Sequence, residues 1–191
     1  ILLLIGLLGS AKGIENKFSV QFGDYATNSV FIWGQSTSKA FKGYQEGRIP
    51  RLKYSHLDKI KNQVKGIKFL LPRNARDARV IRGVQYANFT LSGDFPLLDK
   101  IQKKNLIEGR FINQSDIDEN KKVVVISDDV YKQLFEANDK SVGEFIKINE
   151  INYKIIGLFE EGDFDFGGQL HIPFTTFQSV YNQGDNIGWI T

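Results

Sequence analysis

Apolar positions between residues 121 and 162 follow the spacing of a strand, a helix and two further strands. Val123 to Ile126 is an unbroken apolar run, which is typical of a buried strand. A short helix opened by Asp128 follows, and Gly143 marks a turn. Strict alternation then predicts two more strands, at residues 144–149 and 152–158. The segment contains no nucleophile beside a base, no metal-ligand spacing and no phosphate-binding loop, so its pattern indicates architecture and not catalysis.

The first nine residues, ILLLIGLLG, are apolar and uncharged. A membrane span needs about 20 such residues, so this run alone is too short to cross a bilayer. Apolar side chains continue at helical spacing as far as Gly23, through Ala11, Ile14, Phe18 and Phe22. The run fits the end of a transmembrane helix, a truncated signal-peptide core or a buried helix. The amphipathic continuation favours the first, with residues 1–23 ending as a stalk helix.

Residues 28–71 are predicted to form a β-α-β unit. The first strand covers residues 28–35 and is followed by a polar loop over residues 36–50. Ser55 has the character of a helix N-cap, and Gly66 that of a helix stop. The helix between them has an apolar stripe of Leu57, Ile60 and Val64 and an outer face carrying Lys59, Lys61 and Lys65. The second strand, residues 67–71, is expected to end at Pro72.

The remaining chain alternates short strands, turns and short helices. We expect an extended basic segment, a strand, and then a turn at Gly93 and Asp94 with a short helix after Pro96. An acidic helix start follows at Ser115. The other predicted elements are residues 74–84 (extended), 85–91 (strand), 160–168 (an acidic, glycine-rich loop), 169–172 (a strand ended by Pro173), 175–181 (helix) and 188–191 (the beginning of a strand).

Composition places the chain among folded proteins and removes several chemistries. Apolar residues make up 41% of its 191 residues and charged residues 25%, as in ordinary globular domains. The absence of cysteine excludes disulfides, thiol catalysis and cysteine-based zinc sites. The absence of methionine suggests a piece of a longer chain.

Charge is unevenly distributed along the sequence. Residues 48–82 carry eleven basic side chains against two acidic ones, a local charge of +9, whereas residues 84–191 carry ten basic against seventeen acidic, or −7. A solvated helix face plus a basic strand accounts for the basic part best. Nucleic-acid binding is disfavoured, because only Tyr54 and Phe69 accompany the eleven cations as stacking platforms.

The sequence spacing of the histidines and carboxylates supports neither a catalytic site nor a metal site. His56 and His171 stand far apart and each lacks a ligand pattern nearby. The carboxylates of residues 160–165 lack the twelve-residue calcium-loop spacing. An enzyme using Asp163, Asp165 and His171 is therefore the weakest of three hypotheses.

The order of short motifs resembles the periplasmic core domain of MacB-type permeases, the FtsX-like branch of ABC transporters. The most specific pieces are Gly93-Asp94-Phe95, Glu108-Gly109-Arg110-Phe111, Leu134-Phe135, Gly143, Ile156-Gly157 and Ile172-Pro173. Each is weak alone, but together they cover nearly the whole chain.

The resemblance implies an α+β, two-lobed domain. A partial α/β porter-like lobe would begin at residues 24–84, and an inserted β-rich sabre-like lobe would cover residues 85–187. Residues 188–191 would start the returning half of the first lobe, whose remainder is absent from this sequence. Residues 1–23 would lead out of the first transmembrane helix.

The same resemblance implies a transport module in the bacterial inner membrane, with this domain on the periplasmic side. ATP would bind to a separate or fused cytoplasmic ATPase, so no cofactor and no catalytic residue is expected here. The implied partners are that ATPase, a second permease in a homodimer or heterodimer, and a periplasmic adaptor with an outer-membrane duct. Efflux and lipoprotein export both remain open. The alternative is a secreted or lipid-anchored α/β binding module of the envelope.

Two surface contacts are expected. The tip Phe164-Asp165-Phe166 of the acidic loop is a candidate partner contact, because two aromatic side chains stand together on a loop. Lys59, Lys61 and Lys65 are candidates for contact with an anionic surface, such as lipid head groups, because they share one helix face within the +9 segment.

Overall fold

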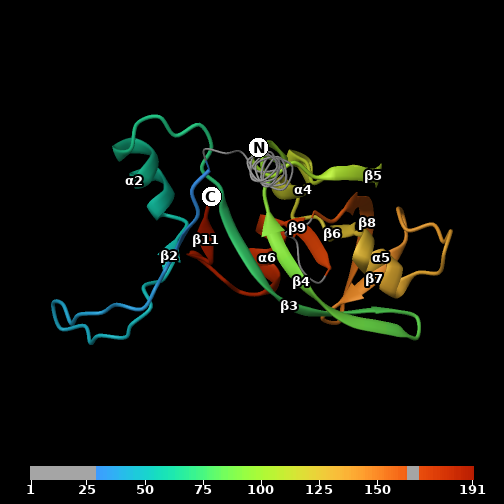
Figure 1. Ribbon diagram of the computed structural model, residues 1–191, viewed down its shortest axis with the longest axis horizontal. Coiled ribbons are helices and arrows are strands. Elements are labelled where there is room, and N and C mark those ends of the chain that lie inside the picture. The colour runs from blue at the N-terminus through green and yellow to red at the C-terminus, as the bar shows by residue number, and fades with distance from the viewer. Residues whose placement is uncertain (1–28, 163–167) are drawn as a thin grey trace, which may run out of the picture.

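The computed structural model describes residues 29–162 and 168–191, which mix short helices with β-strands (Figure 1). The helices in these residues are α2 (His56–Gln63), α3 (Leu98–Ile101), α4 (Gln114–Asp118), α5 (Asp128–Leu134) and α6 (Phe174–Val180). The strands are β1 (Ile32–Trp33), β2 (Leu52–Lys53), β3 (Pro72–Arg82), β4 (Gln85–Asp94), β5 (Asn105–Gly109), β6 (Val123–Ser127), β7 (Phe145–Ile148), β8 (Ile151–Glu160), β9 (Gln169–Pro173), β10 (Asn186–Ile187) and β11 (Trp189–Ile190). No helix in the described part of the chain is long and apolar enough to cross a membrane.

Nine strands form the main sheet, in the order β1-β11-β3-β4-β9-β6-β8-β5. The ninth strand, β7, pairs with both β3 and β8 and so closes six of the strands into a ring. Most neighbours are antiparallel, whereas β9 runs parallel to β4 and β6 runs parallel to β8. Closure of the ring satisfies strand edges that would otherwise be open to unwanted pairing.

The largest buried cluster joins the ring strands to α5 and α6. Val80, Leu91, Ile126 and Ile155 are fully buried in it, with Phe177 contributed by α6. A second cluster lies on the other face, around Val125 and Phe159, and it extends to Leu57 of α2 and Ile187 of β10. The alternation along β6 produces this division, because successive side chains of a strand point to opposite faces.

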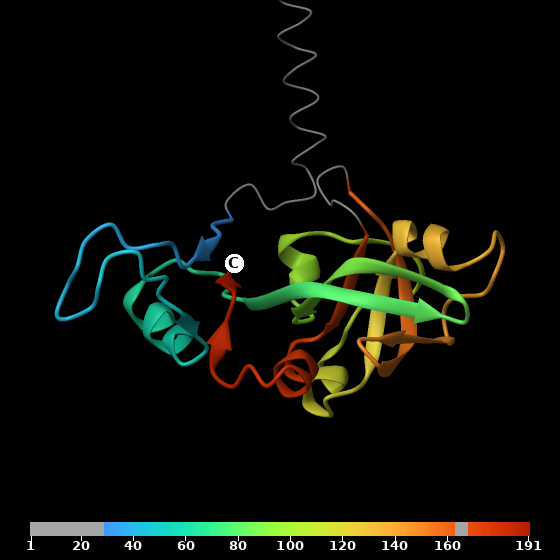
Figure 2. The same ribbon diagram turned by 90° about the horizontal axis from the view of Figure 1, so that it is seen from below.

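The molecule is elongated, with α2, β2 and the loop of residues 36–50 at one end and α5 with β7 at the other (Figures 1 and 2). β2 pairs with β10, and β1 pairs with β11, which in turn pairs with β3. β3 is the element common to both ends, since it pairs with β11 through Pro72 and Arg73 and with β7 through Val80 and Ile81.

The predictions for residues 121–162 are confirmed. The buried strand, the short helix, the turn and the two following strands appear as β6, α5, Gly143 with φ of 100°, β7 and β8. The cap of α5 is Ser127, whose hydroxyl accepts a hydrogen bond from the Val130 N–H at 3.5 Å. The short helix after Pro96, the helix near Ser115, the strand at 169–172 and the closing strand near Trp189 are confirmed as well.

Four expectations for residues 28–94 are wrong. Residues 67–71 are not a strand; Pro72 begins β3, where its missing N–H costs no hydrogen bond within the ladder. Gly93 and Asp94 belong to β4 and form no turn. The β-α-β unit is absent, because β1 and β2 each pair antiparallel with a strand near the C-terminus. Val64 is 52% exposed and so is not part of the inner helix stripe.

Candidate functional site

Motifs that stand far apart in the sequence meet at one place in the fold. Asp94 ends β4, His171 lies on the neighbouring β9, and Phe111 follows β5. The Phe111 ring lies 5.7 Å from the His171 ring, and the Phe159 ring lies 5.3 Å from it on β8. The Gly93-Asp94-Phe95 and Glu108-Gly109-Arg110-Phe111 motifs thus converge on a buried histidine.

A network of three buried polar side chains connects β3, β4 and β9. The Asp94 carboxylate accepts hydrogen bonds from Arg73 Nε at 2.5 Å and from Arg73 Nη2 at 3.2 Å. Its Oδ2 also lies 2.6 Å from His171 Nδ1. Asp94 and His171 are completely buried, and Arg73 is 7% exposed. Trp189 of β11 lies over the Arg73 guanidinium at 5.1 Å, which extends the network to a fourth strand.

The protonation states follow from these contacts. Burial alone would raise the pKa of Asp94, but Arg73 and the hydrogen bond with His171 hold that pKa well below its usual value. Burial lowers the pKa of His171, and the nearby Asp94 offsets this effect only in part. His171 is therefore neutral at pH 7, and its Nδ1–H donates to Asp94. The network carries one buried ion pair and no surplus charge.

Two glycines of the motifs let chain segments approach this network closely. A Cβ on Gly93 would lie 2.6 Å from Phe177 Cβ of α6. Gly109 has φ of +77°, and a Cβ there would lie 2.3 Å from the Ile156 carbonyl oxygen. Only glycine meets both requirements at Gly109, which explains its place in the motif.

Arg110 fixes the short helix that follows the second motif. Its guanidinium donates to both oxygens of Asp116, at 2.6 and 3.0 Å. Asp116 also accepts from the Asn113 N–H, while the Asn113 side chain accepts from the Asp116 N–H, so the two residues form a capping box. The Asp116 side chain is fully buried, and Arg110 compensates its charge.

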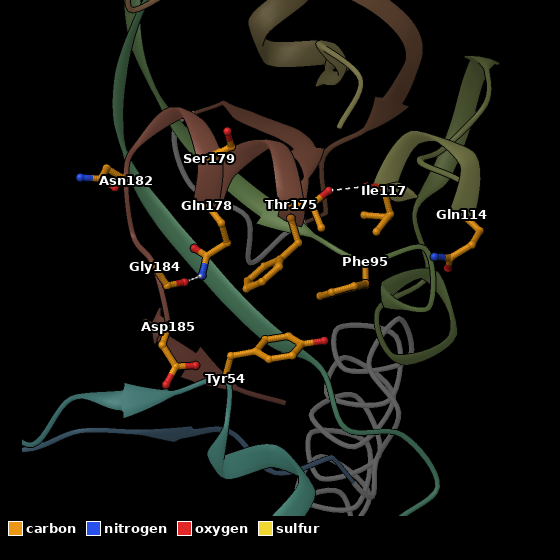
Figure 3. Close-up of a pocket in the computed structure, with 11 residues that line it drawn as sticks. Tyr54, Phe95, Gln114, Ile117, Thr175, Gln178, Ser179, Asn182, Gly184 and Asp185 are labelled. Atoms are coloured by element: carbon orange, nitrogen blue, oxygen red, sulfur yellow. Dashed lines mark hydrogen bonds between the residues drawn. The ribbon is translucent and has the colours of Figure 1, made fainter. Parts of the chain in front are cut away.

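A groove of about 850 Å³ lies beside the network, between the N-terminal part of the described chain and α6 (Figure 3). Its floor is aromatic: the Phe95 and Phe174 rings stack at 4.9 Å, and Tyr54 lies 5.9 Å from Phe174. The rim carries the amides of Gln114, Gln178 and Asn182 and the carboxylate of Asp185. Pockets with apolar floors and a few polar rim groups are the usual form of binding sites in proteins.

The polar rim also fastens the two sides of the groove together. The Ser55 N–H and hydroxyl donate to the two Asp185 oxygens, at 3.0 and 2.7 Å. Ser55 is the N-cap residue of α2, as the sequence predicts, but its hydroxyl donates to Asp185 and makes no capping hydrogen bond with the helix. The hydrogen bonds from Ser55 lower the pKa of Asp185, which therefore stays ionised.

The predicted surface residues have different outcomes. Lys59, Lys61 and Lys65 are exposed, at the end of the molecule opposite α5, and their contact with an anionic surface stays a prediction. Phe164, Asp165 and Phe166 lie outside the described residues, as do Asp163 and residues 1–23. His171 is buried within the network, so the enzyme hypothesis loses the one histidine on which it relied.

One acidic cluster is present among the described residues. Carboxylate oxygens of Asp128, Asp129 and Glu161 lie within 4.8 Å of one another. Lys132 donates to Asp128 at 2.6 Å and to Asp129 at 3.3 Å, so an internal cation already offsets part of the charge of the cluster. The cluster acts as a helix-start ion pair and identifies no metal site.

Sequence reasoning missed the network because its members show no local pattern. The sequence predicts a turn at Asp94, within the Gly93-Asp94-Phe95 motif, and it gives His171 no ligand or catalytic partner nearby. Arg73 carried no signal at all, since it is one of eleven cations in residues 48–82.

Comparison with known proteins agrees with the resemblance found in the sequence. A sequence model of the family described as MacB-like periplasmic core domain matches residues 1–191. The chain is 24% identical, over 177 residues, to the macrolide export ATP-binding/permease protein MacB of Bdellovibrio bacteriovorus, a match that covers 91% of this chain and 27% of that protein. It is 22% identical to the pyoverdine export ATP-binding/permease protein PvdT of Pseudomonas savastanoi, over 90% of this chain and 26% of that protein. The chain thus spans about a quarter of the length of these relatives.

Solved structures show the same fold. The periplasmic region of MacB from Actinobacillus actinomycetemcomitans superposes with a TM-score of 0.70 at 21% identity, over 88% of this chain and 75% of that one. The extracellular domain of the ABC-type transporter YknZ from Gram-positive bacteria superposes with a TM-score of 0.69 at 14% identity, over 84% of this chain and 81% of that one. The chain belongs to the MacB-like periplasmic core domain family, the periplasmic part of ABC transporter permeases.

Proposed function

We propose that this chain is the extracytoplasmic domain of an ABC-type export permease and couples ATP hydrolysis in the cytoplasm mechanically to movement of partners or cargo in the periplasm. The family match over residues 1–191 is the observation that carries the proposal. The domain would lie on the periplasmic side of a bacterial inner membrane, and its own residues would perform no chemistry.

The packing of the domain supports a mechanical role. A displacement applied at β1 or β11 passes to β3 through backbone pairing and to β4 and β9 through the Arg73–Asp94–His171 network. The buried Arg73–Asp94 ion pair at the centre of this network resists rearrangement, because separating the two groups would leave an uncompensated buried charge. β3 then carries the displacement along its eleven residues into the six-stranded ring.

The remaining parts of the proposal come from the family. ATP would be bound by a fused or separate ATPase, as the names of the ATP-binding/permease relatives suggest. A second permease would complete a dimer, and an adaptor with an outer-membrane duct would receive the movement in an efflux system. The relatives named above export macrolides or pyoverdine, and lipoprotein export is the alternative cargo for this chain.

The two-lobed organisation is also proposed. Residues 24–84 would form the first half of a porter-like lobe and residues 85–187 the inserted lobe, with residues 188–191 starting the returning half. Exposed apolar side chains on and beside the edge strand β1 favour this arrangement: Val30, Phe31, Ile32 and Trp33 are between 39% and 68% exposed. A returning segment that packs on β1 would bury them.

Location can be tested with cysteine labelling, because the chain has no cysteine of its own. Val84, which is 90% exposed at the β3–β4 turn, would be replaced in the membrane-bound permease as Val84→Cys. Intact cells treated with a membrane-impermeant maleimide should label this variant and should leave the buried control Val124→Cys unlabelled. Labelling of Val84→Cys only after cell lysis would place the domain in the cytoplasm and reject the proposal.

A further inference from the structure

Residues 36–50 form a protruding arm with a defined tip. The Phe41 and Tyr44 backbones exchange hydrogen bonds of 3.0 Å in both directions, and the Thr37 N–H donates to the Arg48 carbonyl oxygen at 2.9 Å. Lys42 and Gly43 between them have φ of 46° and 82°. Two central residues with positive φ form the tight hairpin turn that matches the twist of paired strands. The arm is therefore a hydrogen-bonded hairpin with a defined tight turn and not an irregular loop.

The tip of the arm is aromatic and basic. Phe41 is 70% exposed, Tyr44 is 58% exposed, and Ile49 is 63% exposed. Lys42 Nζ lies 5.5 Å from the Phe41 ring, and the Arg48 guanidinium lies 4.2 Å from the Tyr44 ring. Neither cation has a carboxylate within ion-pair distance among residues 29–162 and 168–191. Exposed aromatic side chains and arginine are the residues most enriched where proteins bind each other.

The groove on the same chain has the complementary character. Its floor is the aromatic group of Tyr54, Phe95 and Phe174, and the one charged residue lining it in the described chain is the ionised Asp185. Asp118 does not line the groove, but it accepts a hydrogen bond from the lining residue Gln114 and so adds a second negative charge beside it. The arm carries three basic side chains and one acidic one, Glu46.

The arm cannot fill the groove of its own chain. It leads into β2, which is followed at once by the groove residue Tyr54, and it extends away from the molecule in both views (Figures 1 and 2). With about seven residues on each side, it places its tip roughly 23 Å from β2.

We infer that the arm docks into the groove of a second copy of this chain, with Phe41 and Tyr44 on the aromatic floor and Lys42 and Arg48 toward the acidic rim. Each copy offers both features, so two copies exchange arms about a twofold axis and the contact closes at two. The inference rests on the proposed function only in that a permease dimer holds two such domains side by side, which raises their effective concentration.

Disulfide trapping tests the contact directly, since every disulfide in the chain must come from engineered cysteines. The double variant Lys42→Cys with Asn182→Cys places one thiol at the arm tip and one on the groove rim. The control pairs Asn182→Cys with Val84→Cys, an exposed position on a different hairpin turn. On mild oxidation of the full chain in detergent, the arm pair should form covalent dimers at least roughly tenfold faster than the control, the ratio expected for removing a hot-spot contact. Equal rates for the two pairs would overturn the inference.

A second comparison separates specific docking from chance collision. Phe41→Ser with Tyr44→Ser, added to the arm pair, removes two exposed rings and should leave the urea unfolding midpoint unchanged while dimer formation falls to the control rate. Unchanged dimer formation in this variant would overturn the inference. Phosphatidylglycerol vesicles that bind the arm and abolish dimer formation would also overturn it, because the arm would then bind lipid and not a second copy of the chain. Failed trapping in a permease whose Val84→Cys variant is labelled from the periplasm would reject the arm contact and leave the proposed function standing.

Discussion

The Asp94 carboxylate lies 2.6 Å from His171 Nδ1, across two parallel strands that are adjacent in the sheet and 77 residues apart in sequence. The same carboxylate holds Arg73 on the other neighbouring strand. One side chain thus joins three strands that belong to distant parts of the chain.

Removing the charge of Asp94 should destabilise the fold strongly. Asp94→Asn keeps the shape of the side chain but leaves Arg73 buried without a counter-charge, which costs about 3–5 kcal/mol of unfolding free energy. Urea unfolding followed by circular dichroism measures the loss. The exposed Asp77→Asn on β3 is the control and should change the free energy by less than about 0.5 kcal/mol. Equal effects of the two substitutions would contradict the assigned role of the network.

The stability of the domain should fall as the pH falls below about 6.5. Burial lowers the pKa of His171 in the folded state, whereas an unfolded histidine titrates near 6.5. Below that pH the unfolded chain therefore binds a proton that the folded chain does not, and acid favours unfolding by up to about 1.4 kcal/mol per pH unit.

The acid effect can be assigned by substitution. His171→Asn should lower stability at pH 7.5 but remove the His171 share of the slope between pH 6.5 and 5. Asp94 contributes only at lower pH, because its lowered pKa preserves its contribution until the pH falls below the unfolded value of about 3.9. An unaltered slope in His171→Asn would show that another group is responsible.

The close contact of Gly93 with α6 should make even a methyl group costly. Gly93→Ala would place a Cβ 2.6 Å from Phe177 Cβ, and overpacking of this kind costs about 1–3 kcal/mol. Phe177→Gly removes the Cβ and the ring that meet the added methyl group, so the double variant should lose less stability than the sum of the two single variants. Strict additivity in urea unfolding would indicate that Gly93 and Phe177 do not constrain each other.

Gly109 and Gly143 offer a matched comparison of clash and strain. Both have positive φ, of +77° and +100°, but a Cβ on Gly143 meets nothing within 4 Å, whereas one on Gly109 lies 2.3 Å from a carbonyl oxygen. Gly143→Ala should cost about 1–2 kcal/mol from backbone strain alone, and Gly109→Ala should cost clearly more. Similar thermal melting temperatures for the two variants would contradict this assignment.

Local patterns in the sequence were sufficient for the elements that depend on local contacts. The unbroken apolar run at Val123 and the glycine at Gly143 specify β6 and the turn before β7 without help from distant residues. Pro72 and Gly93 were misassigned because their roles are set by distant partners: Pro72 pairs with Ile190, and Gly93 accommodates Phe177. Considered alone, a proline or a glycine indicates the end of a strand or helix. Only the contacts with residues distant in the sequence show that Pro72 and Gly93 lie within strands.

The candidate site was harder to predict than the elements. The motif residues Asp94 and Phe111 were recognised as specific, yet nothing in the sequence connected them to His171. Conversely, the Phe164 tip, Lys59 and Lys61 of α2, and Lys65 just after α2 are candidates because charge and aromatic character are visible in a sequence, and their contacts stay predictions. Burial and pairing across strands are long-range properties, which a single sequence does not display.

The measurement that tests mechanical coupling most directly is the ratio of cargo exported to ATP hydrolysed. It would be made with the whole permease in membrane vesicles, for Asp94→Asn and for the Asp77→Asn control. The temperature would be one at which the unfolding curves show that the domain is folded in both variants. We predict that hydrolysis stays within about twofold of the unmodified permease, while Asp94→Asn lowers export per ATP by roughly tenfold or more, a loss of about 1.4 kcal/mol of coupling. An unchanged ratio in Asp94→Asn would contradict the central claim that this network transmits movement through the domain.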